Sequence, residues 1–519
     1  MLLLEKFLVA WKALQYVPVA VSIGVLALAL KTHFLASNNG ELDENLLEME
    51  FDLKVKEQND CTECVDCPVS QPEADVIDML TKLREWDAEI TTNLQVIRHK
   101  LVNPRMVTSF IIGSTADGAS LAKWFSPDPE ARELEADMQH NGAAFASTHA
   151  HLFEHLTPEK PDNCRIKLDA NILESVALPK LWQLLVRPNK LVGENATETE
   201  RRHKFFQFEY IHPQVIRKVA QHLFALRDNN HEGILALVSV LFGIDIELFE
   251  AQSSDELPER GTALTTTVKV SHKESGRILK LSIDHVAAFS CDFWPEPASG
   301  FMTRRALYDS RDFAPRWPEA EVRASIVASG CDVVPKPSYG GDVNTEFRWS
   351  FARGEKLLMT SLSDKQRRAY FLFKIIFYQH IKPLDKEAIH SYWIKTNMFW
   401  FCELHGADDV IWCDENLFES VRQFYAQFLS MIRGWRLPHF FIPAHSLLKG
   451  PKPEEDVAAH AQQQALVGRL QEIVTSVESY APSVYDFDTV FARLQNVRSI
   501  VVDLKNLSEE QNPLLNKFA

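Results

Sequence analysis

Cysteine is scarce in this sequence, which has eight among its 519 residues. Small secreted domains that rely on disulfides use cysteine much more densely, so the composition argues against a disulfide scaffold. The hydrophobic fraction of 46% and the charged fraction of 24% are those of a folded globular protein. Five of the cysteines are scattered through mostly apolar stretches, where buried free thiols are common: Cys164, Cys291, Cys331, Cys402 and Cys413.

Basic residues are also in deficit, because 55 Lys and Arg stand against 71 Asp and Glu, a formal net charge of −16. Strong nonspecific binding of nucleic acid depends on Lys and Arg that neutralise phosphates. The charge balance therefore argues against such binding, although a local basic groove remains compatible with it. The acidic excess is uneven, since residues 37–70 alone supply half of the net charge.

The three remaining cysteines lie in that acidic stretch, as Cys61-x-x-Cys64-x-x-Cys67. Tight zinc sites need four ligands, usually as two separated pairs. Three thiols in a loop-like acidic stretch therefore favour an exposed, redox-sensitive or lipidated segment over a metal site.

A single uncharged apolar stretch runs from Ala13 to Leu30. Its 18 residues are just enough to cross a bilayer core of about 30 Å as a helix. Lys12 and Lys31 flank it, so charge bias does not set its orientation. We expect a single membrane-spanning helix. A buried helix of a cytoplasmic protein is the alternative, and a cleaved signal peptide fits less well because the start is not basic.

Hydrophobic periodicity organises the rest of the chain. Residues 75–101 have the spacing of a long amphipathic helix, and three stretches have the pattern of strands: 107–112, 264–270 and 278–288, the last two joined by a hairpin-like connection. Residues 205–249 look mainly helical. After residue 365 the pattern is helical throughout, at 369–380, 389–403, 417–432, 458–478 and 487–497.

This order of elements predicts an α+β fold with two lobes and a cleft between them: a mixed sheet with helices, then an all-helical C-terminal lobe. We divide the chain into an apolar segment (1–35), an acidic cysteine-containing linker (36–72), an α+β core (73–335), a helical lobe (336–450) and a helical extension (451–519).

Three features of the α+β core carry chemical information. Gly113-Ser114 ends a predicted strand, where a glycine lets the backbone approach a phosphate and the serine can hydrogen-bond its oxygens. Glu135 and Asp137 would project from the same face of a strand, because side chains alternate with a period of two. Asp284 is centred in a predicted core strand, where a carboxylate is costly unless it is paired or binds a metal ion.

Together these residues form the oxygen-rich site that Mg²⁺ prefers, with carboxylates and substrate phosphates as ligands. Two such ions can activate a hydroxyl group and stabilise a pyrophosphate leaving group. A solvated acidic turn is the alternative for Glu135 and Asp137, because Glu130 and Glu133 precede them.

A competing motif is His151-Leu-Phe-Glu-His155, the H-x-x-E-H pattern of inverted zinc peptidases. On a helix, its two histidines could share one zinc ion. A pattern with three fixed positions has poor specificity in a chain of this length. We therefore interpret it as a histidine-rich helix near the cleft.

Several longer motifs follow in a fixed order: Cys291–Pro295, Ser329–Cys331 with Val333–Pro335, Glu346–Leu358 (EFRWSFARGEKLL), His390–Glu403 (HSYWIKTNMFWFCE) and Phe440–Leu447 (FFIPAHSL). Together they resemble the Mab-21-like family, whose enzyme members include cyclic GMP-AMP synthase and its related receptors. The resemblance covers roughly residues 75–448.

The resemblance implies a nucleotidyltransferase core in residues 73–335 and a role for each matching position. Gly113 and Ser114 fall on the family's phosphate-binding pair, and Glu135, Asp137 and Asp284 on its catalytic ligands for Mg²⁺ or Mn²⁺. The remaining matches are nucleotide contacts. They are Arg348 and Ser350 (phosphates or bases), Lys374 and Ser391 (triphosphate) and Tyr392 (stacking on a base).

The sequence also departs from the synthase pattern. Only a short link separates Glu355 from the helix with Lys374, and it holds no His/Cys cluster, so we expect no structural zinc and no zinc-bearing thumb. This makes DNA a weaker candidate for the activating ligand than double-stranded RNA or another ligand. The link has a small basic cluster, Lys365, Arg367 and Arg368, which suits either phosphates or a solvated helix start.

Two functional hypotheses follow. In the first, the chain is a metal-dependent nucleotidyltransferase that joins nucleoside triphosphates, with a cyclic dinucleotide as one product, when a ligand activates it. In the second, it is a catalytically silent, membrane-tethered Mab-21-like scaffold or binding protein. The three carboxylates favour the enzyme, because unpaired carboxylates on core strands are costly to keep. Nucleotide chemistry favours a cytosolic core.

Overall fold

The computed structural model describes residues 69–101, 108–129, 132–157, 160–167, 210, 213, 249–256, 263–272, 276, 278–304, 317–338, 341–343, 345–406, 410–448 and 457–510. The apolar segment 13–30, the cysteine triplet and almost all of the predicted helical region 205–249 lie outside these residues. Among the residues that were described, no helix is long and apolar enough to span a membrane.

The described strands form one nine-stranded mixed sheet with the order β1-β2-β7-β8-β9-β4-β3, to which β6 and β5 add beside β7. The strands are β1 (Thr108–Ile112), β2 (Leu134–Phe145), β3 (Phe153–His155), β4 (Asn163–Ile166), β5 (Phe249–Glu256), β6 (Ala263–His272), β7 (Ile278–Cys291), β8 (Cys331–Val334) and β9 (Phe347–Ser350). β2 and β7 run parallel, whereas the other paired strands are antiparallel. The predicted strands at 107–112, 264–270 and 278–288 are confirmed as β1, β6 and β7.

Strand β2 extends further than its sequence suggests, because residues 138–141 (Met-Gln-His-Asn) are not typical strand formers. It is held by backbone pairing on both edges, with β1 on one side and β7 on the other. Tertiary pairing therefore overrides the weak local preference of this stretch.

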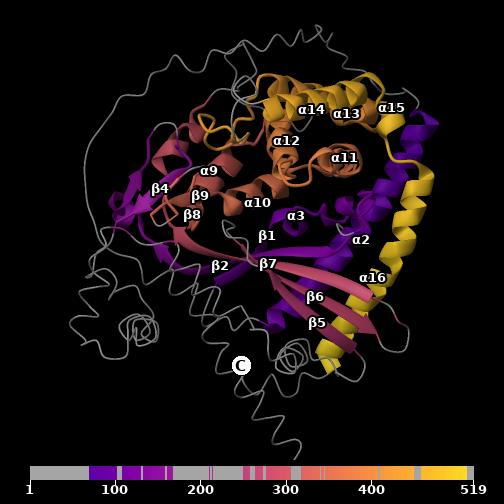
Figure 1. The fold of residues 1–519 in the computed structure, drawn as a ribbon, viewed down its shortest axis with the longest axis horizontal. Helices are drawn as coiled ribbons and strands as arrows, with labels where there is room; N and C mark the ends of the chain where they lie inside the picture. Colours follow the sequence, from indigo (N-terminus) through magenta and orange to yellow (C-terminus); the bar gives the residue numbers. More distant parts are fainter. Residues whose placement is uncertain are drawn as a thin grey trace, which may run out of the picture.

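The helical lobe covers the sheet (Figure 1). It comprises α10 (Ala352–Ser361), α11 (Asp364–Ile376), α12 (Tyr392–His405) and α13 (Leu417–Arg433). α9 (Ala320–Ala328) of the α+β core packs on α10, and α14 (Val457–Thr475) and α15 (Val477–Tyr480) of the helical extension pack on α13. The core of the helical lobe is aromatic, as in the stack of Phe373 on Phe424 with ring centroids 3.9 Å apart. The α+β fold with an all-helical C-terminal lobe is thus confirmed.

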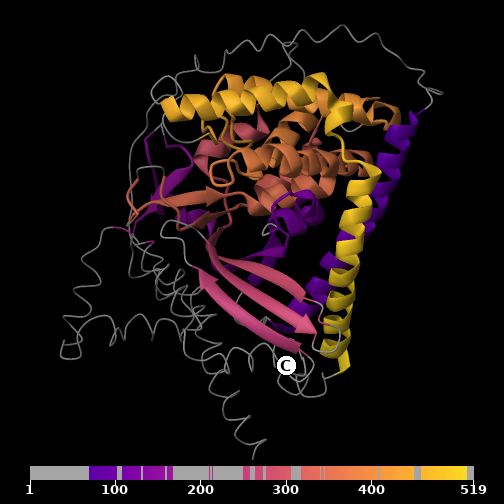
Figure 2. The same ribbon diagram turned by 45° about the vertical axis from the view of Figure 1, so that its right-hand side comes forward.

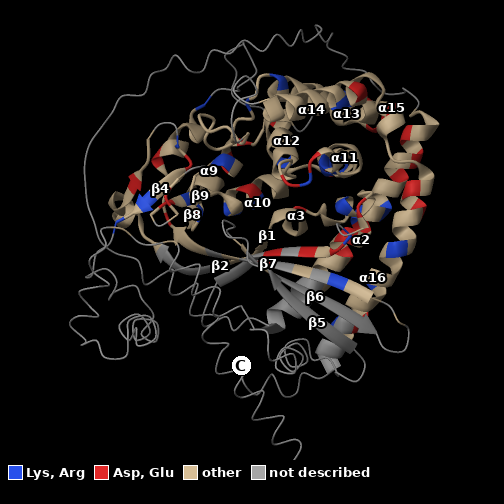
Figure 3. Cartoon of the chain, in the orientation of Figure 1, with Lys and Arg blue, Asp and Glu red and all other residues tan. Residues whose placement is uncertain are grey.

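Two long helices lie side by side along one edge of the molecule (Figure 2). They are α2 (Gln71–Leu101), which confirms the predicted amphipathic helix, and α16 (Val484–Glu510). Arg498 of α16 pairs with Glu89 of α2 at 2.7 Å, and the rings of Trp86 and Phe491 meet edge to face at 5.3 Å. Along α16 both signs of charge occur, so this helix does not offer the continuous basic stripe that a phosphate backbone requires (Figure 3).

The interpretation of the H-x-x-E-H motif as helical was wrong. Residues Ser147–Leu152 form a 3₁₀ turn, and Phe153–His155 form strand β3, paired with β4. The spacing that would bring His151 and His155 to one face exists on an α-helix but not across a turn and a strand. In addition, the Glu154 carboxylate accepts a hydrogen bond from the Tyr210 hydroxyl. The motif therefore does not build a peptidase zinc site.

Candidate active site

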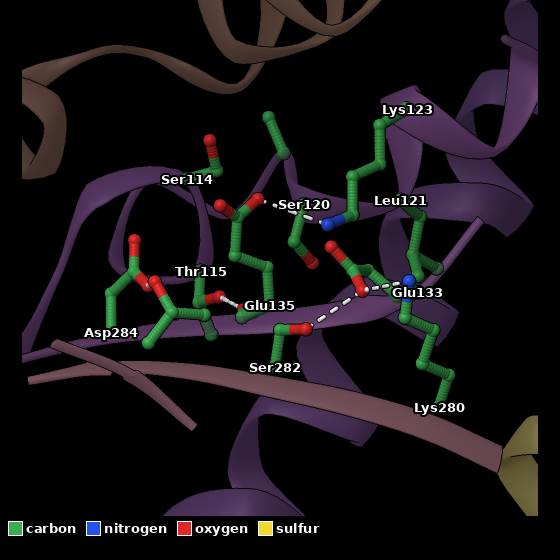
Figure 4. A network of polar contacts seen from close by, with 12 residues as sticks. Ser114, Thr115, Ser120, Leu121, Lys123, Glu133, Glu135, Lys280, Ser282 and Asp284 are labelled. Atoms are coloured by element: carbon green, nitrogen blue, oxygen red, sulfur yellow. Dashed lines mark hydrogen bonds and ion pairs between the residues drawn. The ribbon is translucent and has the colours of Figure 1, made fainter. Parts of the chain in front are cut away.

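The three predicted metal ligands lie together on the parallel strands β2 and β7. The register places Asp137 directly beside Asp284, and Glu135 lies two residues earlier on β2, on the same face. One carboxylate oxygen from each residue lies within 4.8 Å of the others. Figure 4 shows Glu135 and Asp284 rising from the two neighbouring strands.

Burial and crowding set the electrostatics of this trio. Burial, helped by the charges of Glu135 and Asp284, raises the pKa of Asp137 to about 8. Burial also raises the pKa of Asp284, against a hydrogen bond from the Thr265 hydroxyl. Glu135 behaves in the opposite way, because the ammonium of Lys123 lowers its pKa.

Such a trio fits a divalent cation. Three carboxylates that repel one another in a partly buried site gain stability from a cation that neutralises them. Oxygen donors of this kind suit the hard ions Mg²⁺ and Mn²⁺.

The turn after β1 closes over the trio. Gly113 has a φ of +70°, and a Cβ atom at this position would lie 1.7 Å from Asp137 Oδ2. Only glycine fits so close to the carboxylate in this left-handed conformation. The Thr115 hydroxyl donates to the backbone carbonyl of Glu135, which fastens the short helix α3 (Gly113–Ala116) to β2.

Lys374 supports the same turn from behind. Its ammonium donates to Ser114 Oγ and to the Ala119 carbonyl, both at 3.0 Å, and the side chain is 1% exposed. Burial lowers its pKa to about 8, while Asp117 opposes this shift. The sequence predicted that Lys374 contacts the triphosphate, whereas in this structure it faces Ser114 and reaches the site only through that hydroxyl.

A cavity of about 820 Å³ opens beside the trio, between the sheet and the helical lobe. Six of the predicted site residues line it: Gly113, Glu135, Arg348, Ser350, Ser391 and Tyr392. The other four adjoin residues of this lining: Asp137 and Asp284 lie beside Glu135, and Ser114, with Lys374 bonded to it, follows Gly113. The ten residues chosen from sequence are therefore gathered around one cavity.

The far wall of the cavity is a network of charged and polar groups. Asp162 forms an ion pair with Arg348 Nε at 3.1 Å and lies 3.3 Å from His445 Nδ1. The Tyr392 hydroxyl donates to Glu355 Oε1 at 2.8 Å and lies 3.2 Å from His439 Nε2. These contacts fix the orientation of both predicted nucleotide-binding side chains.

Several residues of the site escaped sequence reasoning. Lys395 pairs with Asp117 and Glu355, each at 3.0 Å, and these two carboxylates raise its pKa although burial opposes the shift. A signal was present, because Lys395 is a charge in helix α12, most of whose residues are apolar. Lys123 pairs with Glu135 at 2.9 Å, and no pattern around it indicated this.

The connection between α10 and α11 consists of only Leu362 and Ser363. Ser363 caps α11 and forms a capping box with Gln366. The basic cluster at the start of α11 is engaged in local contacts: Arg367 donates to the Leu362 and Thr360 carbonyls, and Arg368 pairs with Asp414.

Comparison with known proteins agrees with this architecture. The sequence model of the Mab-21 protein nucleotidyltransferase domain matches residues 209–361, and that of the Mab-21 protein HhH/H2TH-like domain matches residues 365–465. The two matches meet at the two-residue connection between α10 and α11. Asp284 lies inside the first match, whereas Gly113, Glu135 and Asp137 precede it and are tied to Asp284 by the sheet.

Curated relatives include three insect proteins named "Protein mab-21-like". That of Aedes aegypti is 24% identical over 224 residues (42% of this chain and 55% of the relative). That of Drosophila melanogaster is 25% identical over 231 residues (42% and 56%), and that of Anopheles gambiae is 24% identical over 214 residues (39% and 54%). The chain thus spans about half the length of the curated relatives it matches. Both domain matches and these relatives support the assignment of the chain to the Mab-21 family.

Proposed function

We propose that this chain is a metal-dependent nucleotidyltransferase that joins nucleoside triphosphates. The observation that carries the proposal is the register of β2 and β7, which brings Glu135, Asp137 and Asp284 within 4.8 Å of one another beside a cavity. A nucleotidyltransferase-type domain implies nucleoside triphosphates as substrates.

In this proposal Glu135, Asp137 and Asp284 hold Mg²⁺ or Mn²⁺. The bound ion would supply charge stabilisation for the transferring phosphoryl group and activate the attacking hydroxyl. Gly113 brings its backbone against the site, and the Ser114 hydroxyl, backed by Lys374, offers a hydrogen bond to a phosphate oxygen.

The opposite wall would bind the nucleotide. Arg348 is held by Asp162, and Tyr392 is held by Glu355 and His439, so both side chains are oriented before a ligand arrives. The cavity volume of about 820 Å³ falls in the usual range for small-molecule sites. Ser350 and Ser391 add hydroxyl groups to the same lining.

The proposal further includes formation of a cyclic dinucleotide and activation by a ligand such as double-stranded RNA.

We also propose that the core is cytosolic and tethered through residues 13–30. Asn506, exposed on α16, begins an Asn-x-Ser glycosylation motif, as Asn195 begins an Asn-x-Thr motif. A glycosidase-sensitive shift in gel mobility after expression in eukaryotic cells would contradict the cytosolic location.

One observation favours the second candidate, a silent scaffold. The ammonium of Lys123 already neutralises the carboxylate of Glu135. A protein that never binds a metal ion would need such a partner for this carboxylate. The first experiment therefore tests turnover. The full chain is incubated with labelled ATP, GTP, CTP and UTP, with Mg²⁺ or Mn²⁺, and with no ligand, double-stranded RNA or double-stranded DNA.

A phosphatase-resistant product that is lost in Asp137→Asn and Asp284→Asn, but kept in the control Asp128→Asn, would support the enzyme. Asp128 is a suitable control because its carboxylate pairs with Lys386 and is not part of the trio. No product under any condition, from folded protein that still binds nucleotide, would favour the scaffold.

A further inference from the structure

The ammonium of Lys123 forms an ion pair with one carboxylate oxygen of Glu135, a predicted metal ligand. The ammonium lies 2.9 Å from Glu135 Oε2, and the lysine side chain is only 8% exposed (Figure 4). The same lysine lines the cavity into which the predicted phosphate-binding turn faces. It therefore contacts the carboxylate trio and also borders the space available to a ligand.

The element that carries Lys123 is fixed in place. It is the 3₁₀ turn η2 (Ser120–Phe125), every residue of which is buried. Asp87 of α2 accepts hydrogen bonds from the Ser120 hydroxyl and from the Leu121 amide. On the other side, the Phe125 ring packs edge to face on Phe487 of α16 at 5.2 Å.

Lys123 thus differs from a lysine on the surface that pairs with a carboxylate by chance, because its side chain is buried. A buried ammonium is costly unless it is paired, and Glu135 supplies that pairing. The backbone is held by α2 and α16, whereas the four-carbon stem of the side chain can still turn.

A divalent cation on Glu135 would be close to this ammonium, and like charges a few ångströms apart repel each other in a partly buried site. Either the metal ion binds weakly, or the ammonium must find another acceptor. The phosphates of a nucleotide in the cavity are such an acceptor, because Lys123 lines that space.

We propose that Lys123 is a charge switch that makes metal binding depend on nucleotide. Without nucleotide it holds Glu135 and competes with the metal ion; with nucleotide its ammonium turns to a phosphate oxygen and releases Glu135. This inference rests on the proposed function and adds to it a mechanism that keeps the site metal-poor until substrate arrives.

The test is Mn²⁺ binding to the full chain, measured by titration calorimetry and by the loss of the free Mn²⁺ signal in electron paramagnetic resonance. Lys123→Gln is compared with the wild type, without and with a non-hydrolysable ATP analogue. Lys280→Gln is the matched control, because Lys280 pairs at 3.0 Å with Glu133, a neighbouring carboxylate outside the trio.

Without nucleotide, Lys123→Gln should bind Mn²⁺ roughly tenfold more tightly than the wild type, within the usual range of coupling between sites. Lys280→Gln removes the same charge and should change the affinity by much less. The analogue should strengthen Mn²⁺ binding more in the wild type than in Lys123→Gln. Lys123→Arg keeps the charge and should keep the nucleotide dependence. If Lys123→Gln does not fold, Lys123→Met replaces it in the titration, because methionine keeps an aliphatic side chain without the charge.

Equal or weaker Mn²⁺ binding by a folded Lys123→Gln or Lys123→Met would overturn the charge switch while leaving the metal site standing. If neither the wild type nor the variants bind Mn²⁺, even with the analogue, the proposed function falls as well.

Discussion

Gly113 and Asp137 are in direct contact across the entrance to the carboxylate trio. A Cβ atom on Gly113 would lie 1.7 Å from Asp137 Oδ2, which no backbone adjustment of a few tenths of an ångström relieves. The glycine also has a φ of +70°, which L side chains rarely adopt. Two independent constraints, one on conformation and one on space, thus require glycine at this position.

Gly113→Ala should therefore weaken metal binding in addition to lowering the stability of the protein. The left-handed backbone alone costs about 1 kcal/mol for alanine, and the added methyl group must displace Asp137 or the turn. We expect Mn²⁺ binding to fall at least about tenfold, a loss of about 1.4 kcal/mol.

Gly118→Ala is the matched control for this prediction. Gly118 has a similar φ of +67°, but nothing lies within 4 Å of a Cβ atom there. Thermal unfolding should show only the cost of backbone strain in Gly118→Ala and at least that loss in Gly113→Ala, while only Gly113→Ala loses Mn²⁺ binding. Equal binding by the two variants would show that the contact with Asp137 does not matter.

Asp137→Asn should stabilise the metal-free protein. Burial together with the charges of Glu135 and Asp284 disfavours an ionised Asp137, and an amide removes that penalty. We expect a gain of at least about 1 kcal/mol at neutral pH, the value of one pKa unit. Urea unfolding in EDTA measures the gain, and addition of Mn²⁺ should then stabilise the wild type but not Asp137→Asn. A loss of stability in EDTA would contradict the repulsion within the trio.

Local sequence patterns predicted the positions that alternate or repeat. The i, i+2 spacing of Glu135 and Asp137 placed both on one face of a strand, and helical spacing gave α2. Helix α16 begins and ends beyond the predicted range 487–497, because its buried face continues through Ile500 and Val501 against α2. The parallel pairing of β2 with β7 joins residues far apart in the chain, and no local pattern contains that information.

Polar contacts between residues far apart in the sequence could not be predicted from local patterns either. The hydrogen bond from Ser120 to Asp87 and the ion pair of Lys123 with Glu135 depend on how α2, η2 and β2 pack against one another. The H-x-x-E-H motif failed for the opposite reason, because five residues fit a helical pattern by chance while backbone pairing made part of them a strand. Short motifs are thus informative only when the surrounding elements are known.

Asp162 should position Arg348 rather than contact the nucleotide through its own charge. It holds Arg348 Nε at 3.1 Å and is itself buried, so an amide in its place would weaken the hold on the guanidinium. We expect Asp162→Asn to weaken ATP binding by a few-fold to about tenfold, as typical for a residue that orients a binding group. Fluorescent-nucleotide titration measures this.

The experiment needs Arg348→Lys as its companion. Lysine keeps the charge but cannot keep the geometry of a planar guanidinium. If Asp162 acts through Arg348, the double variant should bind nucleotide no worse than Arg348→Lys alone. Additive losses would show that Asp162 acts independently.

His439 should make the stability of the protein fall with pH below neutrality. Burial is the main cause that lowers its pKa to about 3; the neighbouring His445 contributes to this shift, and Asp162 opposes it. Its Nδ1 accepts from the Phe441 and Ile442 amides, both at 3.2 Å, so a proton on this nitrogen would break two hydrogen bonds. The folded protein therefore keeps the ring neutral.

The unfolded chain protonates this histidine near pH 6.5, whereas the folded protein does so only near pH 3. The unfolded state thus binds more protons between these values, and the contribution of His439 to stability is complete above pH 6.5 and is lost as pH falls towards 3. The slope is up to about 1.4 kcal/mol per pH unit. In His439→Asn, whose side-chain oxygen can still accept the two amides, urea midpoints from pH 7.5 to 4.5 should fall less steeply. The exposed His460→Asn should keep the wild-type slope, and a wild-type slope in His439→Asn would contradict the assignment.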